Sequence, residues 1–151
     1  MTIYEKLQEL KIDLPVPEPP VAAFIPTVRT GNLLFVSGHI AKREGKSWAG
    51  QLGSGIKTDE GRQAARNAAV DLLATLHHEL GGLAHVKRIV KLLCLVNSAP
   101  NFTEQHLVAN GASELLCDVF GKDGLHARSA IGVAQLPLGS CVEIEAVVEV
   151  Q

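Results

Sequence analysis

The chain ends in two β-like stretches that carry an arginine and two glutamates. Arg128 opens the first stretch, and Glu143 and Glu145 stand one residue apart in the second. Side chains alternate between the two faces of a strand, so the apolar residues predict a core face and place Arg128, Ala130 and Gly132 on the other face. The same alternation places both glutamates on that non-core face. A guanidinium fork fits a carboxylate bidentately and a glutamate can orient water, which indicates a small-anion site. The alternative is a solvated, charge-balanced surface.

The spacing of these residues limits how they can act together. A turn centred near Leu138 would pair the two stretches as a hairpin, with Glu143 opposite Val133. Arg128 would then lie about 17 Å further along at ~3.4 Å per residue, too far for a simple cross-strand salt bridge. Three arrangements would still join the residues: a ligand and the long arginine side chain span part of the gap, sheet curvature closes it, or a neighbouring subunit completes the site.

Other residues with reactive side chains give weaker signals. His77 and His78 are about 100° apart around a helix and lack the i, i+4 spacing of a metal pair, so we expect them to face solvent. The cysteines fall singly inside apolar runs, and we expect buried small side chains at Cys94, Cys117 and Cys141. No metal site is expected.

Composition favours one domain without a nucleic-acid or membrane partner. A chain of 151 residues can bury about 70% of its unfolded surface. The net charge of −2, with its basic residues dispersed, offers no stripe that would neutralise many phosphates. No apolar run approaches the roughly 20 residues of a membrane span, and the first ten residues are amphipathic, so we expect a cytoplasmic protein.

The helices and strands that must position these residues are predicted from the spacing of apolar residues and from turn-forming and capping residues. We expect a helix over residues 2–10, strands over 22–28 and 33–40 joined by a turn at Gly31 and Asn32, and an exposed loop over 41–55. Trp48 in that loop is interpreted as an anchor, with a lid over a pocket as the alternative. A helix with Thr58 as its N-cap follows, over residues 58–80, and carries an apolar face.

The second half of the chain predicts a central strand over residues 86–96 that is buried on both faces, and a helix over 102–120 capped by Asn101 with Glu104. Gly111 inside this helix indicates a close backbone approach or a break. The order β-β-α-β-α-β-β predicts an α+β fold: a mixed sheet with two main helices on one face. The uncovered face would then need a partner sheet from another copy.

The segments TGNLLFVSGHI and HARSAIGVAQLPLGSCVEIEAVVEV resemble the RidA/YjgF family, over about residues 21–150. The segments VNSAPNF, NGASELL and HARSA resemble a divergent branch of that family. The resemblance implies a chorismate-mutase-like fold, a homotrimer with clefts between subunits, and cofactor-independent hydrolysis of enamines and imines to 2-keto acids. It divides the chain into an N-terminal helix and proline-rich lead-in over residues 1–20 and the family domain over 21–151.

The resemblance also assigns roles to individual residues. Arg128 corresponds to the arginine that holds the substrate carboxylate, and Glu143 to the glutamate that positions water. Ser37 corresponds to the serine of the S-G-Q turn. Four further positions depart from the family pattern, with the expected residue given in brackets: Phe24 (tyrosine), His39 (glutamine), Ala130 (cysteine) and His126 (proline). The helix asparagine of the family corresponds to Asn110 or His106.

These residues predict hydrolytic deamination of small 2-imino or enamine acids in an intersubunit cleft. Arg128 and Glu143 would be catalytic, and the other corresponding residues would line the substrate site. His126 is either such a lining group or an ordinary loop-end histidine. The alternative function is a non-catalytic trimer that binds small carboxylate metabolites, because Phe24 and Ala130 lack the family's hydroxyl and thiol. Ribonuclease activity ranks third because the chain has no basic patch.

Overall fold

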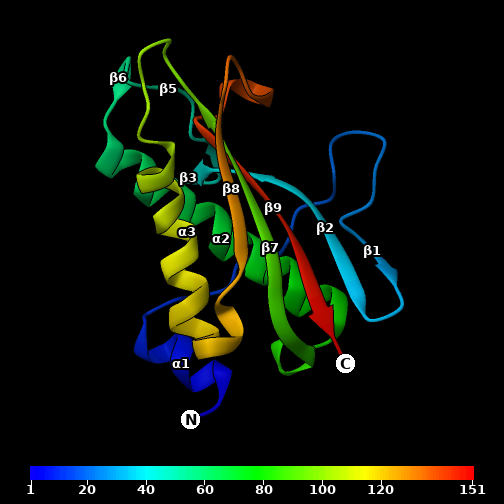
Figure 1. The fold of residues 1–151 in the computed structure, drawn as a ribbon. Coiled ribbons are helices and arrows are strands. Elements are labelled where there is room, and N and C mark those ends of the chain that lie inside the picture. Colours follow the sequence, from blue (N-terminus) through cyan, green and yellow to red (C-terminus); the bar gives the residue numbers. More distant parts are fainter.

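A five-stranded sheet forms the centre of the computed structural model, which describes residues 1–151 (Figure 1). Neighbouring strands are antiparallel except for the last pair, which is parallel. From one edge of the sheet to the other the order is β1 (Thr27–Thr30), β2 (Leu33–Ile40), β9 (Val142–Val150), β7 (Val86–Asn97) and β8 (Ala127–Val133). The expected tight turn joins β1 to β2, since Thr30 pairs with Leu33 across Gly31 and Asn32.

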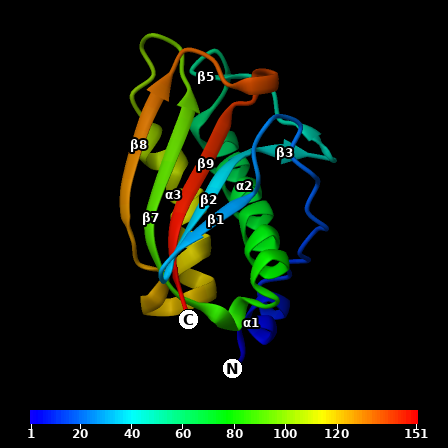
Figure 2. The same cartoon turned by 90° about the vertical axis from the view of Figure 1, so that its right-hand side faces the viewer.

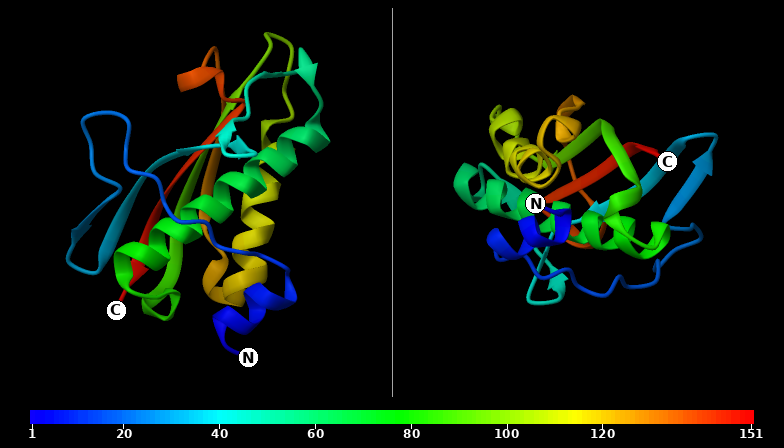
Figure 3. Two further views of the ribbon diagram at one scale, coloured as in Figure 1. Left: turned by 180° about the vertical axis from the view of Figure 1, so that it is seen from behind. Right: turned by 90° about the horizontal axis from the view of Figure 1, so that it is seen from below.

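Two helices, α2 (Thr58–Leu80) and α3 (Gln105–Phe120), lie against the same face of this sheet (Figures 2 and 3). The predicted apolar face of α2 is buried there, and the α+β class with two main helices on one face is confirmed. The short helix α1 (Ile3–Glu9) precedes a lead-in that crosses the molecule to β1. Thr2 and Glu5 close its capping box. None of the helices combines the length and the apolar character that a membrane span requires.

The expected exposed loop over residues 41–55 is more ordered than predicted. It forms a small hairpin from β3 (Lys42–Arg43) and β4 (Lys46–Ser47), followed by β5 (Gln51–Leu52) and β6 (Gly55–Ile56). Trp48 is only 7% exposed, and the Arg43 guanidinium lies 4.4 Å from its ring centroid. Trp48 therefore anchors the segment, which is why a glycine-rich stretch folds back onto the core.

Several predicted boundaries were wrong. The first strand begins at Thr27 rather than at residue 22, since Pro26 has no N–H to give to a ladder. Helix α3 begins at Gln105, because Glu104 accepts a hydrogen bond from Thr58 Oγ1 (2.6 Å) instead of completing a capping box with Asn101. Thr58 is accordingly the first residue of α2, and Lys57 is its N-cap.

The last two strands do not form the predicted hairpin, because β7 lies between β8 and β9. Residues 134–141, which include a 3-10 turn at Pro137–Gly139, carry the chain over the end of β7. Asn97 fixes this crossing: its backbone N–H donates to Cys141 O (2.9 Å) and its Nδ2 to Ser140 O (3.1 Å). The separation expected between Arg128 and Glu143 therefore rested on a wrong pairing.

The face of the sheet opposite the helices is uncovered in the single chain. Strand β7 was expected to be buried on both faces, but its outward side chains Leu93 and Leu95 are only partly buried. Further apolar side chains lie on that open face, by register with these two: Val28, Phe35, Ile131 and Val147.

Candidate functional site

Arg128 lies on the edge strand β8 and reaches toward helix α3. Its Nη1 donates to Asn110 Oδ1 (2.8 Å) and to Ser113 Oγ (3.2 Å), and its Nη2 donates to His106 O (3.2 Å). The structure thus brings Asn110 to the arginine, as one of the two predicted candidates, whereas His106 contributes its backbone carbonyl. Three hydrogen bonds fix the guanidinium against the helix.

His126 belongs to the same group of side chains. Its Nδ1 lies 2.6 Å from Gly124 O, and its Nε2 lies 2.9 Å from Ser113 Oγ. Because a carbonyl oxygen only accepts, Nδ1 carries the hydrogen, and in the neutral imidazole Nε2 then accepts from the Ser113 hydroxyl. We call Asn110, Ser113, His126 and Arg128 the arginine cluster.

The predicted face of Arg128 and Ala130 was wrong. Both pair with buried residues of β7, Leu92 and Cys94, and so point to the helix side of the sheet. The outward residues of β8 include Ser129 and Ile131, and Ile131 is 46% exposed. The alternation of apolar and polar residues did not identify the core face, because β8 is an edge strand that α3 covers only in part. Neither face of β8 is fully buried.

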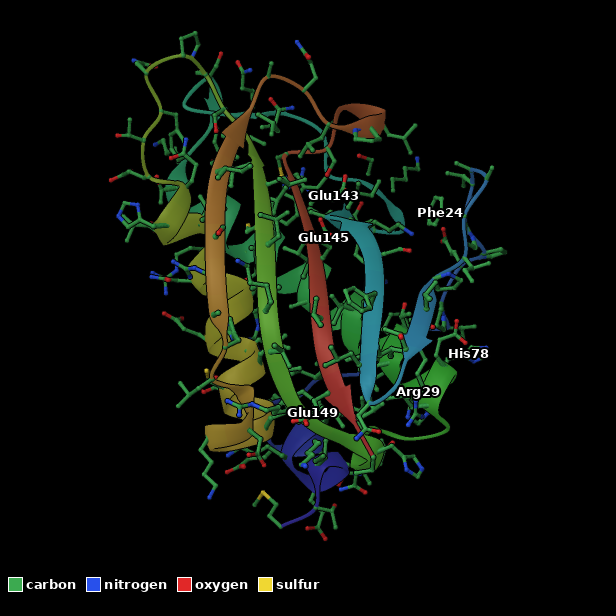
Figure 4. All side chains as sticks on the ribbon, turned by 45° about the vertical axis from the view of Figure 1, so that its right-hand side comes forward. Phe24, Arg29, His78, Glu143, Glu145 and Glu149 are labelled. Atoms are coloured by element: carbon green, nitrogen blue, oxygen red, sulfur yellow. The ribbon has the colours of Figure 1, made fainter.

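Glu143 lies on the opposite, open face, in register with Leu95 and Ile40. Its carboxylate packs against Gly38, where a side chain would collide with it. Burial raises the pKa of the Glu143 carboxyl above its usual range, and the neighbouring Glu145 raises it further. Figure 4 shows both glutamates projecting from β9. A half-buried carboxylate with a raised pKa is a suitable proton acceptor.

Ser37 stands at the bulge of β2 beside Gly38, between the paired residues Val36 and His39. Its Oγ donates to Ile25 O (2.6 Å), and its N–H donates to Pro26 O (2.9 Å). These bonds hold the segment that carries Phe24 (Figure 4). Phe24 is 48% exposed. We call Ser37, Gly38 and Glu143 the glutamate cluster.

His39 does not join either cluster. It pairs with Ile144 on the helix side, where Nδ1 donates to Ser37 O (2.7 Å) and Nε2 accepts from Thr75 Oγ1 (2.8 Å). Burial lowers the pKa of its imidazole, opposed by the Ser37 carbonyl and assisted by the charge of Lys42. His39 is therefore a neutral structural histidine that fixes the bulge of β2 from the helix side of the sheet.

Of the other reactive side chains, the adjacent histidines and two of the three cysteines are placed as expected, whereas Cys117 was expected to be buried and is not. His77 and His78 are exposed. Burial raises the pKa of the Cys94 thiol to about 12 and that of Cys141 to about 11, while Cys117 is only partly buried on α3. No group of three or more His, Cys, Asp or Glu side chains is placed to hold a metal ion.

Sequence reasoning missed two residues of these clusters, Ser113 and Gly38. Ser113 follows Asn110 by three positions on α3, so the two face the same way, a helical spacing that could have indicated a polar pair. Two of the surface hollows have linings that include neither Arg128 nor Glu143. One, of about 580 Å³, lies on the open face beside Leu33, Arg88 and His126.

The protein is an α+β domain in which two helices cover one face of a mixed sheet. Arg128 lies on its edge strand β8, and Glu143 lies two strands away on β9. The family model described as Endoribonuclease L-PSP matches residues 16–150, and the chain belongs to this family, whose RidA/YjgF motifs it carries.

Individual relatives resemble the chain over nearly its whole length. Protein TCP17 of Trypanosoma cruzi is 48% identical over 145 residues, which cover 95% of this chain and 91% of that protein. The structure of Atu1372 from Agrobacterium tumefaciens, a protein of unknown function, is 42% identical with a TM-score of 0.91, covering 99% of this chain and 92% of that one. A Shewanella oneidensis structure, provisionally assigned as an endoribonuclease, is 28% identical with a TM-score of 0.95, covering 99% and 100%.

Proposed function

We propose that this protein hydrolyses small 2-imino or enamine acids to 2-keto acids and ammonia in a cleft between two copies of the chain. The observation that carries the proposal is the placement of Arg128 and Glu143 on opposite faces of one sheet. A single chain cannot direct both at one ligand. The arginine cluster of one copy therefore meets the glutamate cluster of the next.

The open face of the sheet supports assembly. Its half-exposed apolar side chains, among them Phe35 and Ile131, would be buried against other copies, and burial of apolar surface contributes about 25 cal/mol per Å². A ring of three copies gives each arginine cluster one neighbouring glutamate cluster. Light scattering should report three times the monomer mass of 16.1 kDa.

In the proposed reaction Arg128 binds the substrate carboxylate, and Glu143 takes a proton from a water molecule that attacks the imine carbon. As the carbon–oxygen bond forms, the Glu143 carboxyl passes the proton that it took from water to the imine nitrogen. It then transfers the hydroxyl proton of the carbinolamine to the amine, so that the carbon–nitrogen bond can break. The carbinolamine then loses ammonia, and the water oxygen becomes the keto oxygen. The raised pKa of the Glu143 carboxyl favours its role as the base. No cofactor is required for these steps.

The test supplies the purified protein with imine generated by an amino-acid oxidase and follows keto-acid release. We expect faster release with the wild type than with Arg128→Ala or Glu143→Gln. Release that is no faster with the wild type than with Arg128→Ala would rule out the catalytic proposal. RNA incubated in parallel tests the ribonuclease activity in the family's description, which the net charge of −2 does not favour.

A second candidate is a non-catalytic binder of small carboxylate metabolites. Phe24 and Ala130 favour it, because neither supplies a polar group at positions where the family pattern has a hydroxyl and a thiol. A binder would gain thermal stability from 2-keto acids in a way that depends on Arg128 but not on Glu143. An enzyme needs both residues for turnover.

A further inference from the structure

Hydrogen bonds to helix α3 fix the orientation of the Arg128 guanidinium as well as its position. A guanidinium has five N–H donors. Three of those of Arg128 are used within the chain: two on Nη1, toward Asn110 and Ser113, and one on Nη2, toward His106 O. The donors that remain are Nε–H and one N–H of Nη2. This pair can bind the two oxygens of one planar carboxylate side-on.

Ser113 accepts from Arg128 only if its own hydrogen points elsewhere. His126 provides that direction, since its Nε2 lies 2.9 Å from Ser113 Oγ and its Nδ1 hydrogen is committed to Gly124 O at 2.6 Å. The chain of donors and acceptors therefore runs in one sense, from Arg128 to Ser113, then to His126, then to Gly124 O. A histidine at this position replaces the proline of the family pattern, which could make neither bond.

We propose that Ser113 and His126 are positioning residues that hold the Arg128 guanidinium for side-on binding of a substrate carboxylate through Nε and Nη2. The inference rests on the proposed function and deepens it, since it specifies how this site would bind the carboxylate of its substrate. Neither residue touches the substrate. Both act on the orientation of the arginine.

Binding of two matched ligands separates this role from a merely structural one. Calorimetry would compare pyruvate with pyruvamide, its uncharged amide, on the wild type and on Ser113→Ala. We expect Ser113→Ala to weaken pyruvate binding about tenfold, the order of one charged hydrogen bond, and to leave pyruvamide binding within about twofold. Ser113→Thr keeps the hydroxyl and should retain most of the affinity for pyruvate.

Ser129→Ala is the control, because this hydroxyl lies one residue from Arg128 on the opposite face and contacts Lys91. It should leave pyruvate binding unchanged. Unaltered pyruvate binding in Ser113→Ala, or equal weakening of both ligands, would overturn the positioning role. A wild type that binds no pyruvate would instead overturn the proposed function itself, and this inference with it.

His126 is tested by its effect on steady-state kinetics. His126→Phe keeps an aromatic ring but removes Nε2, which accepts from Ser113. We therefore expect KM for the carboxylate substrate to rise about tenfold, while kcat stays within about twofold of the wild-type value. His126→Gln, whose amide oxygen can accept, should recover part of that loss. An unchanged KM in His126→Phe contradicts the proposal. If this variant does not fold, the Ser113 series decides.

Discussion

Arg128 and Glu143 lie on opposite faces of the same sheet, with β7 between their strands. Arg128 is paired with buried Leu92 on the helix side, whereas Glu143 is paired with Leu95 on the open side. Their strands are two steps apart, about 10 Å in the hydrogen-bonding direction. The two clusters are therefore complementary parts of one site only if they come from different copies of the chain.

Gly38→Ala should lower kcat. The added methyl would occupy the space of the Glu143 carboxylate and displace it from its place beside the β2 bulge. We expect a loss of at least about tenfold in kcat with little change in KM, because general-base catalysis contributes about 10²–10⁴-fold and depends on position. Imine-hydrolysis kinetics provide the measurement.

The control for this change is a double variant. In a Glu143→Gln background, where the base is already absent, Gly38→Ala should cause no further loss. An additional tenfold loss there would mean that Gly38 acts through something other than Glu143.

His39 should make the protein less stable as the pH falls. Burial lowers the pKa of the folded imidazole below its ordinary value of 6.5. The unfolded chain therefore binds a proton first as the pH drops through 6.5, and the free energy of unfolding falls from there until the folded imidazole also titrates. Above this window both states are neutral, and His39 adds no pH dependence.

His39→Gln removes that titration while keeping a donor and an acceptor. Urea unfolding of both proteins between about pH 5 and pH 8 should give a shallower acid decline for the variant. Other titrating groups, such as Glu143, are common to both proteins and cancel in the difference. Parallel curves for the two proteins would contradict a neutral, buried His39.

Gly111→Ala should destabilise the protein although alanine is the better helix former. A side chain at Gly111 would meet the backbone carbonyl of Arg62, where α3 packs against α2. Overpacking costs about 1–3 kcal/mol, against a gain of about 1 kcal/mol in helix propensity. Urea unfolding at one fixed protein concentration should show the loss. Asp118→Ala, an exposed change on the same helix, should not.

Much of the fold could be predicted from the sequence because the strongest signals are local. The apolar face of α2, the Gly31–Asn32 turn and the helix at residues 2–10 each depend on residues that are close in the chain. Strand neighbours depend on long-range packing. Nothing in the residues between β8 and β9 indicates that they cross the end of β7 rather than turn back, so the hairpin prediction failed.

The sequence indicated candidate residues for the site but not their geometry. Family motifs indicated Arg128, Glu143, Ser37 and Asn110, and the structure places them in two clusters. The face of β8 on which Arg128 lies was predicted wrongly, because neither face of this edge strand is fully buried. His39 was predicted near the substrate, but the β2 bulge turns its ring toward Thr75. The contact of Ser113 with both Arg128 and His126 depends on helix α3 packing beside β8, which no local pattern encodes.

Mixing two inactive variants tests most directly whether the site is shared between copies. Arg128→Ala and Glu143→Gln, refolded together in equal amounts, should recover about one quarter of the wild-type imine-hydrolysis rate, since random assembly joins an intact arginine to an intact glutamate in that fraction of clefts. Arg128→Ala mixed with the Arg128→Ala/Glu143→Gln double variant should recover none. Activity of the first mixture that stays at the level of its separate components would contradict a site built from two copies of the chain.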